Sequence, residues 1–129
     1  MKHIIIGGDG FVGSHLAADL SAMGEEVLVA DIHQSSHAHY AKVPFLTVDV
    51  TKAESVDAIP LTPEDLVYNL SAKMLSPIVT RAERHEFFWP VNYHGTQNIL
   101  SWMEKNGANR LVHFTTDMIY GHSVTVPQD

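Results

Sequence analysis

A glycine-rich segment, Gly7-Gly8-Asp9-Gly10-Phe11-Val12-Gly13, constrains the fold of this chain more than any other feature of its sequence. An apolar run at residues 3–7 leads into it, and a helical pattern at residues 11–23 follows it and ends at Gly24. A strand, a glycine-rich turn and a helix in this order open the first βαβ unit of nucleotide-binding sheets. The side of the helix expected to face the sheet carries Val12, Leu16, Ala17, Leu20 and Met23.

Three glycines of this segment have separate expected tasks. Gly7 permits the tight turn, Gly10 lets the backbone approach a pyrophosphate, and Gly13 lets the helix pack closely on the strand. The amides of Phe11 and Val12 would then face the anion at the helix N-terminus. A glycine-rich turn without a ligand is the alternative, and the flanking strand and helix argue against it.

An acidic residue, Asp31, ends the second apolar run, about 20 residues past the glycine segment. At such a position a carboxylate accepts hydrogen bonds from both hydroxyls of an adenosine ribose, and it repels the 2′-phosphate of NADP. Neither Ile32 nor His33 supplies the arginine that usually holds that phosphate. The sequence therefore predicts NAD as the cofactor, with a solvated turn acid as the alternative reading of Asp31.

The rest of the chain continues the alternation of strands and helices. Apolar runs predict further strands at residues 27–30, 44–48, 66–70 and 110–115, and helical patterns predict helices at 52–58 and 84–105. Continuous apolar strands separated by helices are typical of a parallel sheet with both faces covered. Right-handed crossovers then give a doubly wound, Rossmann-type α/β sheet in the order 3-2-1-4-5. Pro90 would bend the long helix or mark its start.

Composition and charge narrow the possible partners. The formal net charge of −7, with only eight Lys and Arg residues, argues against nucleic acid. No apolar run approaches the length of about 20 residues that a membrane span requires. The chain contains no cysteine, which excludes disulfides and cysteine-ligated zinc and fits a reducing cytoplasm. His33, His37 and His39 are expected in a solvated loop, and no metal site is expected.

Five motifs, in order along the chain, resemble those of one enzyme family. They are the glycine segment with its spacing of three and three, Asp49-Val50-Thr51, Asn69-Leu70-Ser71-Ala72, and residues 92–100 and 110–121. Together they resemble the extended branch of the short-chain dehydrogenase/reductase superfamily, the NAD-dependent epimerase/dehydratase family. The resemblance covers residues 1–129 and implies one NAD-binding domain of Rossmann type.

The resemblance also implies roles for single residues. Asp49 and Val50 would contact the adenine, while the segment 70–72 would line the cofactor near its ribose and nicotinamide. Asn92 would face the site from the long helix, with a hydrogen bond to backbone as the alternative. The expected cofactor-binding residues are thus Gly7, Gly10, Phe11, Val12, Gly13, Asp31, Ile32, Asp49, Val50, Leu70, Ser71, Ala72 and Asn92.

Thr116 matches the catalytic Ser/Thr of this family, whose hydroxyl hydrogen-bonds the substrate oxygen; an ordinary strand-end residue is the alternative. The family's acid/base is a Tyr followed four residues later by a Lys, which lowers the pKa of the phenol. None of the four tyrosines has such a lysine. We therefore expect the chain to stop before the sixth strand, the catalytic pair and the substrate-binding region. Met118 stands where related dehydratases carry a Glu, which disfavours dehydration.

The resulting hypothesis is an NAD-dependent epimerase/dehydratase-type oxidoreductase that acts on a nucleotide sugar or a related hydroxylated substrate by reversible hydride transfer. A non-catalytic dinucleotide-binding module with a sensing or regulatory task is the alternative. The long helix at 84–105 could join two subunits in a homodimer through its aromatic residues Phe88, Trp89 and Trp102, with core packing as the alternative. His113 is expected to be a hydrogen-bonded residue of a buried strand.

The cofactor hypothesis predicts the outcome of a double substitution. Asp31→Ala together with Ile32→Arg removes a charge that repels the 2′-phosphate and adds one that attracts it. We expect weaker binding of NAD and tighter binding of NADP, measured by titration calorimetry. If the order of the two affinities stays as it is in the unaltered chain, Asp31 does not read the ribose.

Overall fold

The computed structural model describes residues 1–35, 40, 42–74 and 80–116. Its strands are β1 (Lys2–Ile6), β2 (Glu26–Asp31), β3 (Phe45–Thr47), β4 (Leu66–Asn69) and β5 (Leu111–His113). Its helices are α1 (Phe11–Ala22), α2 (Ala53–Asp57), α3 (Arg84–Trp89), the π-helical segment η1 (Pro90–Gly95) and α4 (Thr96–Lys105). Each element that the sequence predicts is present, with ends that differ by at most two residues.

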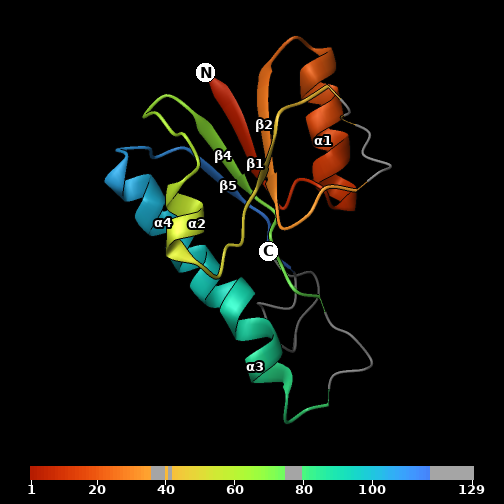
Figure 1. The fold of residues 1–129 in the computed structure, drawn as a ribbon, viewed down its shortest axis with the longest axis vertical. Coiled ribbons are helices and arrows are strands. Elements are labelled where there is room, and N and C mark those ends of the chain that lie inside the picture. Colours follow the sequence, from red (N-terminus) through yellow and green to blue (C-terminus); the bar gives the residue numbers. More distant parts are fainter. Residues whose placement is uncertain (36–39, 41, 75–79, 117–129) are drawn as a thin grey trace, which may run out of the picture.

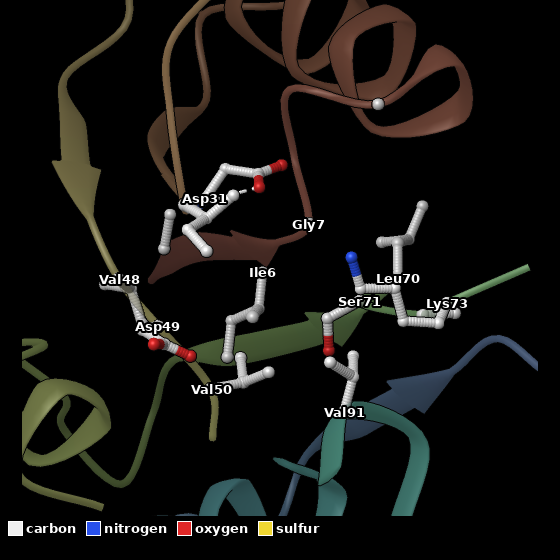
Figure 2. A pocket seen from close by; sticks show the side chains of 14 residues that line it. Ile6, Gly7, Asp31, Val48, Asp49, Val50, Leu70, Ser71, Lys73 and Val91 are labelled. Carbon is white, nitrogen blue, oxygen red and sulfur yellow. Dashed lines mark hydrogen bonds between the residues drawn. The ribbon is translucent and has the colours of Figure 1, made fainter. Parts of the chain in front are cut away.

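The five strands form one parallel sheet in the order β3-β2-β1-β4-β5, as the sequence predicted. Ile6 at the end of β1 lies opposite Ala30 of β2 and Asn69 of β4. All strands therefore end along one edge of the sheet. The chain order reverses between β2 and β4 on either side of β1, which is the place where sheets of this kind bind ligands. Figure 2 shows side chains from the ends of these strands converging on this edge.

Helices cover both faces of the sheet, with α1 on one face and α2 and α4 on the other (Figure 1). The central strand β1 is buried on both sides: Ile5 belongs to the apolar cluster under α1, and Ile4 and Ile6 belong to the cluster under α2 and α4. A strand with two buried faces needs apolar residues in succession. This requirement explains the unbroken apolar run before the glycine segment.

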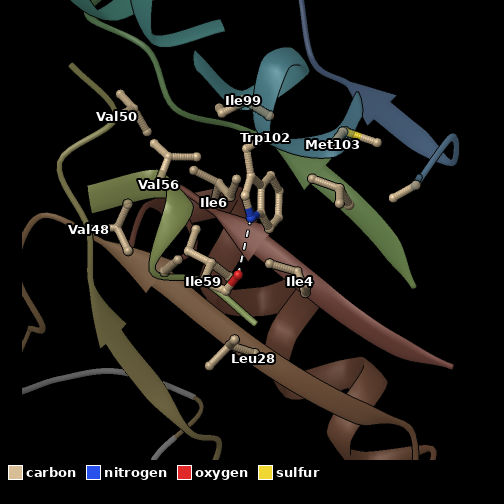
Figure 3. Packing of buried hydrophobic residues seen from close by; sticks show 13 residues of the cluster. Ile4, Ile6, Leu28, Val48, Val50, Val56, Ile59, Ile99, Trp102 and Met103 are labelled. Carbon is tan, nitrogen blue, oxygen red and sulfur yellow. Dashed lines mark hydrogen bonds between the residues drawn. The ribbon is translucent and has the colours of Figure 1, made fainter. Parts of the chain in front are cut away.

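Trp102 of α4 occupies the centre of the larger cluster, with no exposed surface. Its indole Nε1 donates a hydrogen bond to the carbonyl of Ile59 at 3.1 Å, so the buried polar atom has a partner (Figure 3). Trp102 therefore packs in the core. Trp89 is 41% exposed, so the predicted partner contact of the long helix would involve Trp89. The homodimer itself stays a prediction.

The long helix runs without a break from α3 through η1 into α4, so Pro90 marks a change of helix type and not its start. Proline has no amide to donate to the preceding turn, and the wider π-helical turn begins at this residue. Gly95 is the last residue of η1 and lies close to the sheet. A Cβ added at Gly95 would lie 2.8 Å from Cγ2 of Val50. The helix thus approaches the end of β3 closely because Gly95 has no side chain.

Two expectations about burial were wrong. Val12 and Met23 are 50% and 74% exposed, because α1 meets the sheet through its small residues Gly13, Ser14 and Ala17, flanked by Leu16 and Leu20. Because α1 approaches the sheet closely at Gly13, the side of the helix that packs on the sheet is the one with small residues, and Val12 and Met23 lie outside it. His113 is exposed at the edge strand β5, although its Nδ1 lies 3.2 Å from Nδ2 of Asn69, which confirms its hydrogen bond.

Within the described part of the chain, no helix has the length and apolar character needed to cross a membrane. His37, His39 and Met118 lie outside the described residues, so the structure says nothing about the loop and the motif to which they belong.

The packing of α1 predicts that Gly13→Ala destabilises the fold. The new Cβ would lie 2.6 Å from Cα of Gly8 and 2.7 Å from the carbonyl oxygen of Gly7, both of which are backbone atoms. We expect the free energy of unfolding in urea to fall by about 1–3 kcal/mol, the usual range for overpacking. Gly10→Ala is the matched control, since its Cβ would meet only the Gly7 oxygen at 3.4 Å. Equal losses in both variants would contradict this account.

Candidate functional site

The ends of the strands open onto one cavity of about 230 Å³ (Figure 2). It is lined by Ile6, Gly7, Gly10, Ala30, Asp31, Ile32, Val48, Asp49, Val50, Leu70, Ser71, Ala72, Lys73 and Val91. Pockets that enclose a whole drug-sized ligand measure about 300–1,000 Å³. The cavity is therefore suited to one part of a dinucleotide, with the remainder on the open surface beside it.

Most of the cofactor residues predicted from the sequence come together in this lining: Gly7, Gly10, Asp31, Ile32, Asp49, Val50, Leu70, Ser71 and Ala72. Phe11, Val12, Gly13 and Asn92 do not line the cavity, and neither does Thr116. The sequence reasoning missed Lys73 and four apolar residues. Lys73 directly follows a recognised motif and could have been found, whereas Ile6, Ala30, Val48 and Val91 have the same sequence signal as core residues.

The fold requires glycine at positions 7 and 13 of the glycine segment and does not require it at position 10. Gly7 has φ +77°, and a Cβ there would lie 2.7 Å from the backbone of Leu70 and Ser71. Gly13 admits no Cβ either, so the predicted tasks of Gly7 and Gly13 are confirmed. Gly10 has φ −69° and ψ 174°, an extended backbone open to any residue, and space around its Cα. No contact within the described residues explains a glycine at position 10, which is consistent with a ligand that approaches there.

The N-terminus of α1 begins at this glycine. The first helical hydrogen bond runs from the amide of Ser14 to the carbonyl of Gly10 at 2.9 Å. The amides of Phe11, Val12 and Gly13 come before that bond, and Gly10 as N-cap residue has no side chain with which to bond them. Such a helix end attracts an anion such as a pyrophosphate. The residues thus fit the phosphate group that the sequence predicted.

Asp31 is held in place by two backbone amides. Its Oδ2 accepts from the amide of Asp9 at 2.9 Å, and its Oδ1 accepts from the amide of Ile32 at 2.7 Å. Each carboxylate oxygen has more than one acceptor position, so both retain capacity for the hydroxyls of a ribose. The structure therefore does not show Asp31 as a freely solvated turn acid: the side chain ties the end of β2 to the glycine segment and lines the cavity.

Asp49 is fixed in a similar manner on the opposite wall. Its Oδ1 accepts hydrogen bonds from the hydroxyl of Thr51 at 2.7 Å and from the amide of Thr51 at 3.0 Å. The Thr51 hydroxyl is the main cause that holds the pKa of Asp49 below its usual value, and Lys52 contributes a further lowering. Asp49 therefore stays ionised at neutral pH. The carbonyl of the neighbouring Val50 accepts from Nδ2 of Asn98 at 2.8 Å.

The buried side chain of Asn69 holds the loop after β4 in place through hydrogen bonds to Ser71. Asn69 is 1% exposed, and its Oδ1 accepts from the hydroxyl of Ser71 at 2.6 Å and from the amide of Ser71 at 3.1 Å. Its Nδ2 faces Nδ1 of His113 at 3.2 Å. Asn69 thus links the cavity wall at Ser71 to the edge strand β5, and it does so from within the sheet.

Asn92 fastens the next part of the same loop. Its Oδ1 accepts from the amide of Lys73 at 2.7 Å, and its Nδ2 donates to the carbonyl of Lys73 at 3.0 Å. The hydrogen bond to backbone that the sequence left open as an alternative is therefore present. In this arrangement Asn92 positions the loop, and its amide is directed at Lys73 and not into the cavity.

Thr116 lies at the same edge of the sheet, although apart from the cavity. The amide of Phe114 donates to the carbonyl of Asn69 at 3.0 Å, which continues the pairing of β4 with the chain just beyond β5. Thr116 follows two residues later and is exposed. Its position beyond the strand end is compatible with the predicted contact to a substrate.

Comparison with known protein families identifies one whose members bind NAD, in agreement with the cavity at the strand ends. A family described as the NAD dependent epimerase/dehydratase family matches residues 3–129. The chain belongs to this family. Its fold, its five-stranded parallel sheet and its NAD cofactor are those that the sequence predicted, and NAD is the cofactor of the family.

Individual proteins of known activity or structure are also similar to this chain. UDP-glucose 4-epimerase of Halalkalibacterium halodurans is 29% identical over 98% of this chain. UDP-N-acetyl-alpha-D-glucosaminuronate decarboxylase of Bacillus cytotoxicus is 28% identical over 92% of this chain. The chain spans 38% and 37% of the length of these two relatives. Among solved structures, the Thermus thermophilus UDP-glucose 4-epimerase in complex with NAD has a TM-score of 0.71 and 30% identity, over 86% of this chain and 36% of that one.

The contrast between Gly10 and its neighbours predicts that Gly10→Val weakens or abolishes cofactor binding and leaves the fold intact. The backbone of Gly10 suits valine, and the N-cap change costs about 1 kcal/mol or less. The branched side chain would, however, occupy the approach of the pyrophosphate. We expect the Kd for NAD to rise by at least about tenfold in calorimetry, as one blocked anion site implies.

Ser21→Val, at the exposed far end of α1, is the matched control and leaves the Kd unchanged. An unchanged Kd in Gly10→Val, with the same melting curve as the control, would remove the glycine segment from the cofactor site.

Proposed function

We propose that this chain is the NAD-binding domain of an NAD-dependent oxidoreductase of the epimerase/dehydratase type, which acts on a nucleotide sugar. The observation that carries the proposal is the convergence of Gly10, Asp31, Asp49 and Ser71 on one cavity at the switch point of the sheet. The named relatives that act on UDP-sugars support the substrate class. The absence of cysteine supports a cytoplasmic protein.

The binding arrangement follows from the position of each residue. The amides of Phe11 and Val12 would hold the pyrophosphate at the N-terminus of α1, since they precede the first helical hydrogen bond. Asp31 would accept the adenosine ribose hydroxyls, and Asp49 with Val50 would border the adenine. NAD supplies the hydride acceptor when it is bound. Lys73 has the one cationic side chain among the described residues of the lining, and its charge would partly offset that of the two carboxylates and the phosphates.

The loop after β4 would carry the nicotinamide half of the cofactor. Its backbone is fixed twice, by the buried Asn69 at Ser71 and by Asn92 at Lys73. A loop held in this manner is ordered before the cofactor arrives, so less conformational freedom is lost on binding. Thr116 would then orient the substrate oxygen from the adjacent strand end, through its hydroxyl.

The chemical step needs a group that moves a proton together with the hydride. None of the four tyrosines of this chain has a lysine four residues later, so the chain lacks the pair that would do so in this family. We therefore propose that the chain contributes cofactor binding and the Thr116 contact, and that proton transfer depends on residues outside it.

This division of tasks predicts that the 129-residue chain alone binds NAD and turns over no substrate. Loss of general acid/base catalysis costs about 10²–10⁴ in rate, and loss of substrate positioning adds to this. An assay with NAD and UDP-, GDP- and dTDP-sugars, followed by absorbance of the reduced cofactor and by product analysis, is expected to stay at background.

Turnover that Thr116→Val abolishes would contradict this prediction, and it would require an acid/base among the residues present. Failure of the unaltered chain to bind NAD would instead overturn the proposed function itself.

A further inference from the structure

A second carboxylate lies next to Asp31, on the glycine segment itself. The amide of Asp9 donates to Oδ2 of Asp31 at 2.9 Å, and only three covalent bonds separate that amide from the Asp9 carboxyl carbon. The two carboxylates are thus closer than the Debye length of about 8 Å at physiological salt. Charges at this separation act together on any ionic group that binds beside Asp31.

The side chain of Asp9 is fixed from two directions. Its Oδ2 accepts from the amide of Ser35 at 2.9 Å, and its Oδ1 accepts a short hydrogen bond from the hydroxyl of Tyr40. Tyr40 is 2% exposed and packs in the cluster under α1, so the donor cannot move away. Asp9 therefore joins the glycine segment to the chain that follows β2.

In this pair the hydroxyl of Tyr40 is the donor and the carboxylate of Asp9 is the acceptor. Burial, followed by the hydrogen bond to Asp9, raises the pKa of Tyr40 above its usual range. The tyrosine hydroxyl thus stays protonated and donates at neutral pH, while Asp9 accepts at both of its oxygens.

We propose that Asp9 is a second determinant of cofactor choice, because its fixed carboxylate excludes the 2′-phosphate of NADP beside Asp31. This inference rests on the proposed function, in which Asp31 binds the adenosine ribose. The phosphate would carry up to two negative charges into a place that already holds two carboxylates. Asp9 also engages the Ser35 amide and Asp31 engages the Ile32 amide, which are donors that a phosphate would otherwise use.

If Asp9 and Asp31 both exclude NADP, a full change of preference from NAD to NADP requires that both carboxylates be replaced. Replacement of Asp31 leaves the Asp9 charge in place, so the gain in NADP binding is incomplete until Asp9 is replaced too. A purely structural role for Asp9, as the acceptor that Tyr40 and Ser35 need, would have no such effect on the NAD-to-NADP ratio.

The test measures the Kd of NAD and of NADP by calorimetry for the 129-residue chain and its variants. Asp9→Asn and Asp9→Ser remove the charge, and Asp9→Glu disturbs the same hydrogen bonds and keeps it. We expect both neutral variants to bind NADP about tenfold more tightly, with a gain that shrinks as salt is added, while Asp9→Glu shows no gain. The Kd of NAD is expected to stay within about twofold in the neutral variants, because the amide of residue 9 still donates to Asp31.

Asp19→Asn is the matched control for net charge, since Asp19 lies exposed on the later part of α1 and outside the glycine segment. Asp9→Asn in the Asp31→Asn background is expected to give a further gain in NADP affinity, because the charge of Asp9 is still present when that of Asp31 has been removed.

The inference is overturned if the unaltered chain binds NAD and neither neutral variant gains affinity for NADP, or if Asp9→Glu gains as much as Asp9→Asn. Two neutral side chains are tested so that misfolding of one, detected by its melting curve, leaves the other to decide. Absence of NAD binding in the unaltered chain would be a failure of the proposed function and not of Asp9 as a determinant.

Discussion

Contact between backbone atoms, at places where no side chain fits, sets the geometry of this molecule. A Cβ at Gly7 would meet the backbone of Leu70 and Ser71 at 2.7 Å, and a Cβ at Gly13 would meet Cα of Gly8 at 2.6 Å. These contacts bring the start of α1 against the turn after β1 and bring that turn against the loop after β4. The helix N-terminus, the end of β1 and the end of β4 therefore meet at one point, and the cavity exists because they do.

Polar side chains then hold this junction, and most of them bond backbone. Asp31 binds the amides of Asp9 and Ile32, Asn69 binds the amide of Ser71, and Asn92 binds both backbone groups of Lys73. Each of these side chains closes a loop at a strand end, where the ladder of the sheet no longer supplies partners. These hydrogen bonds within the chain limit the conformational freedom of the cavity walls, which favours tight binding of a cofactor.

On the opposite side of the sheet, one glycine and one aromatic residue set the position of the long helix. Gly95 lets the π-helical segment approach Val50, and the buried Trp102 fills the space beneath α4 while its Nε1 bonds the carbonyl of Ile59. The first contact sets the position of Val91 at the cavity and of Asn92 at the loop. Core packing and the arrangement of the site are thus consequences of the same helix position.

Local patterns of residues were enough to predict the fold class, the strand order and most of the cavity lining. Glycine spacing and runs of apolar residues are local signals, and the carboxyl ends of parallel strands must share one edge. Which side chains at that edge face the cavity, and which hold the loops, depends on packing between segments that lie far apart in the sequence. The side chain of Asn92 bonds the backbone of Lys73 and does not enter the cavity. The apolar residues Ile6 and Val91, by contrast, line the cavity. Val12 is exposed because α1 packs on the sheet through Gly13 and the other small residues of that side. The link from Asp9 to Tyr40 spans 31 positions, and such a pairing depends on how the segment after β2 returns to the glycine turn, which no local pattern encodes.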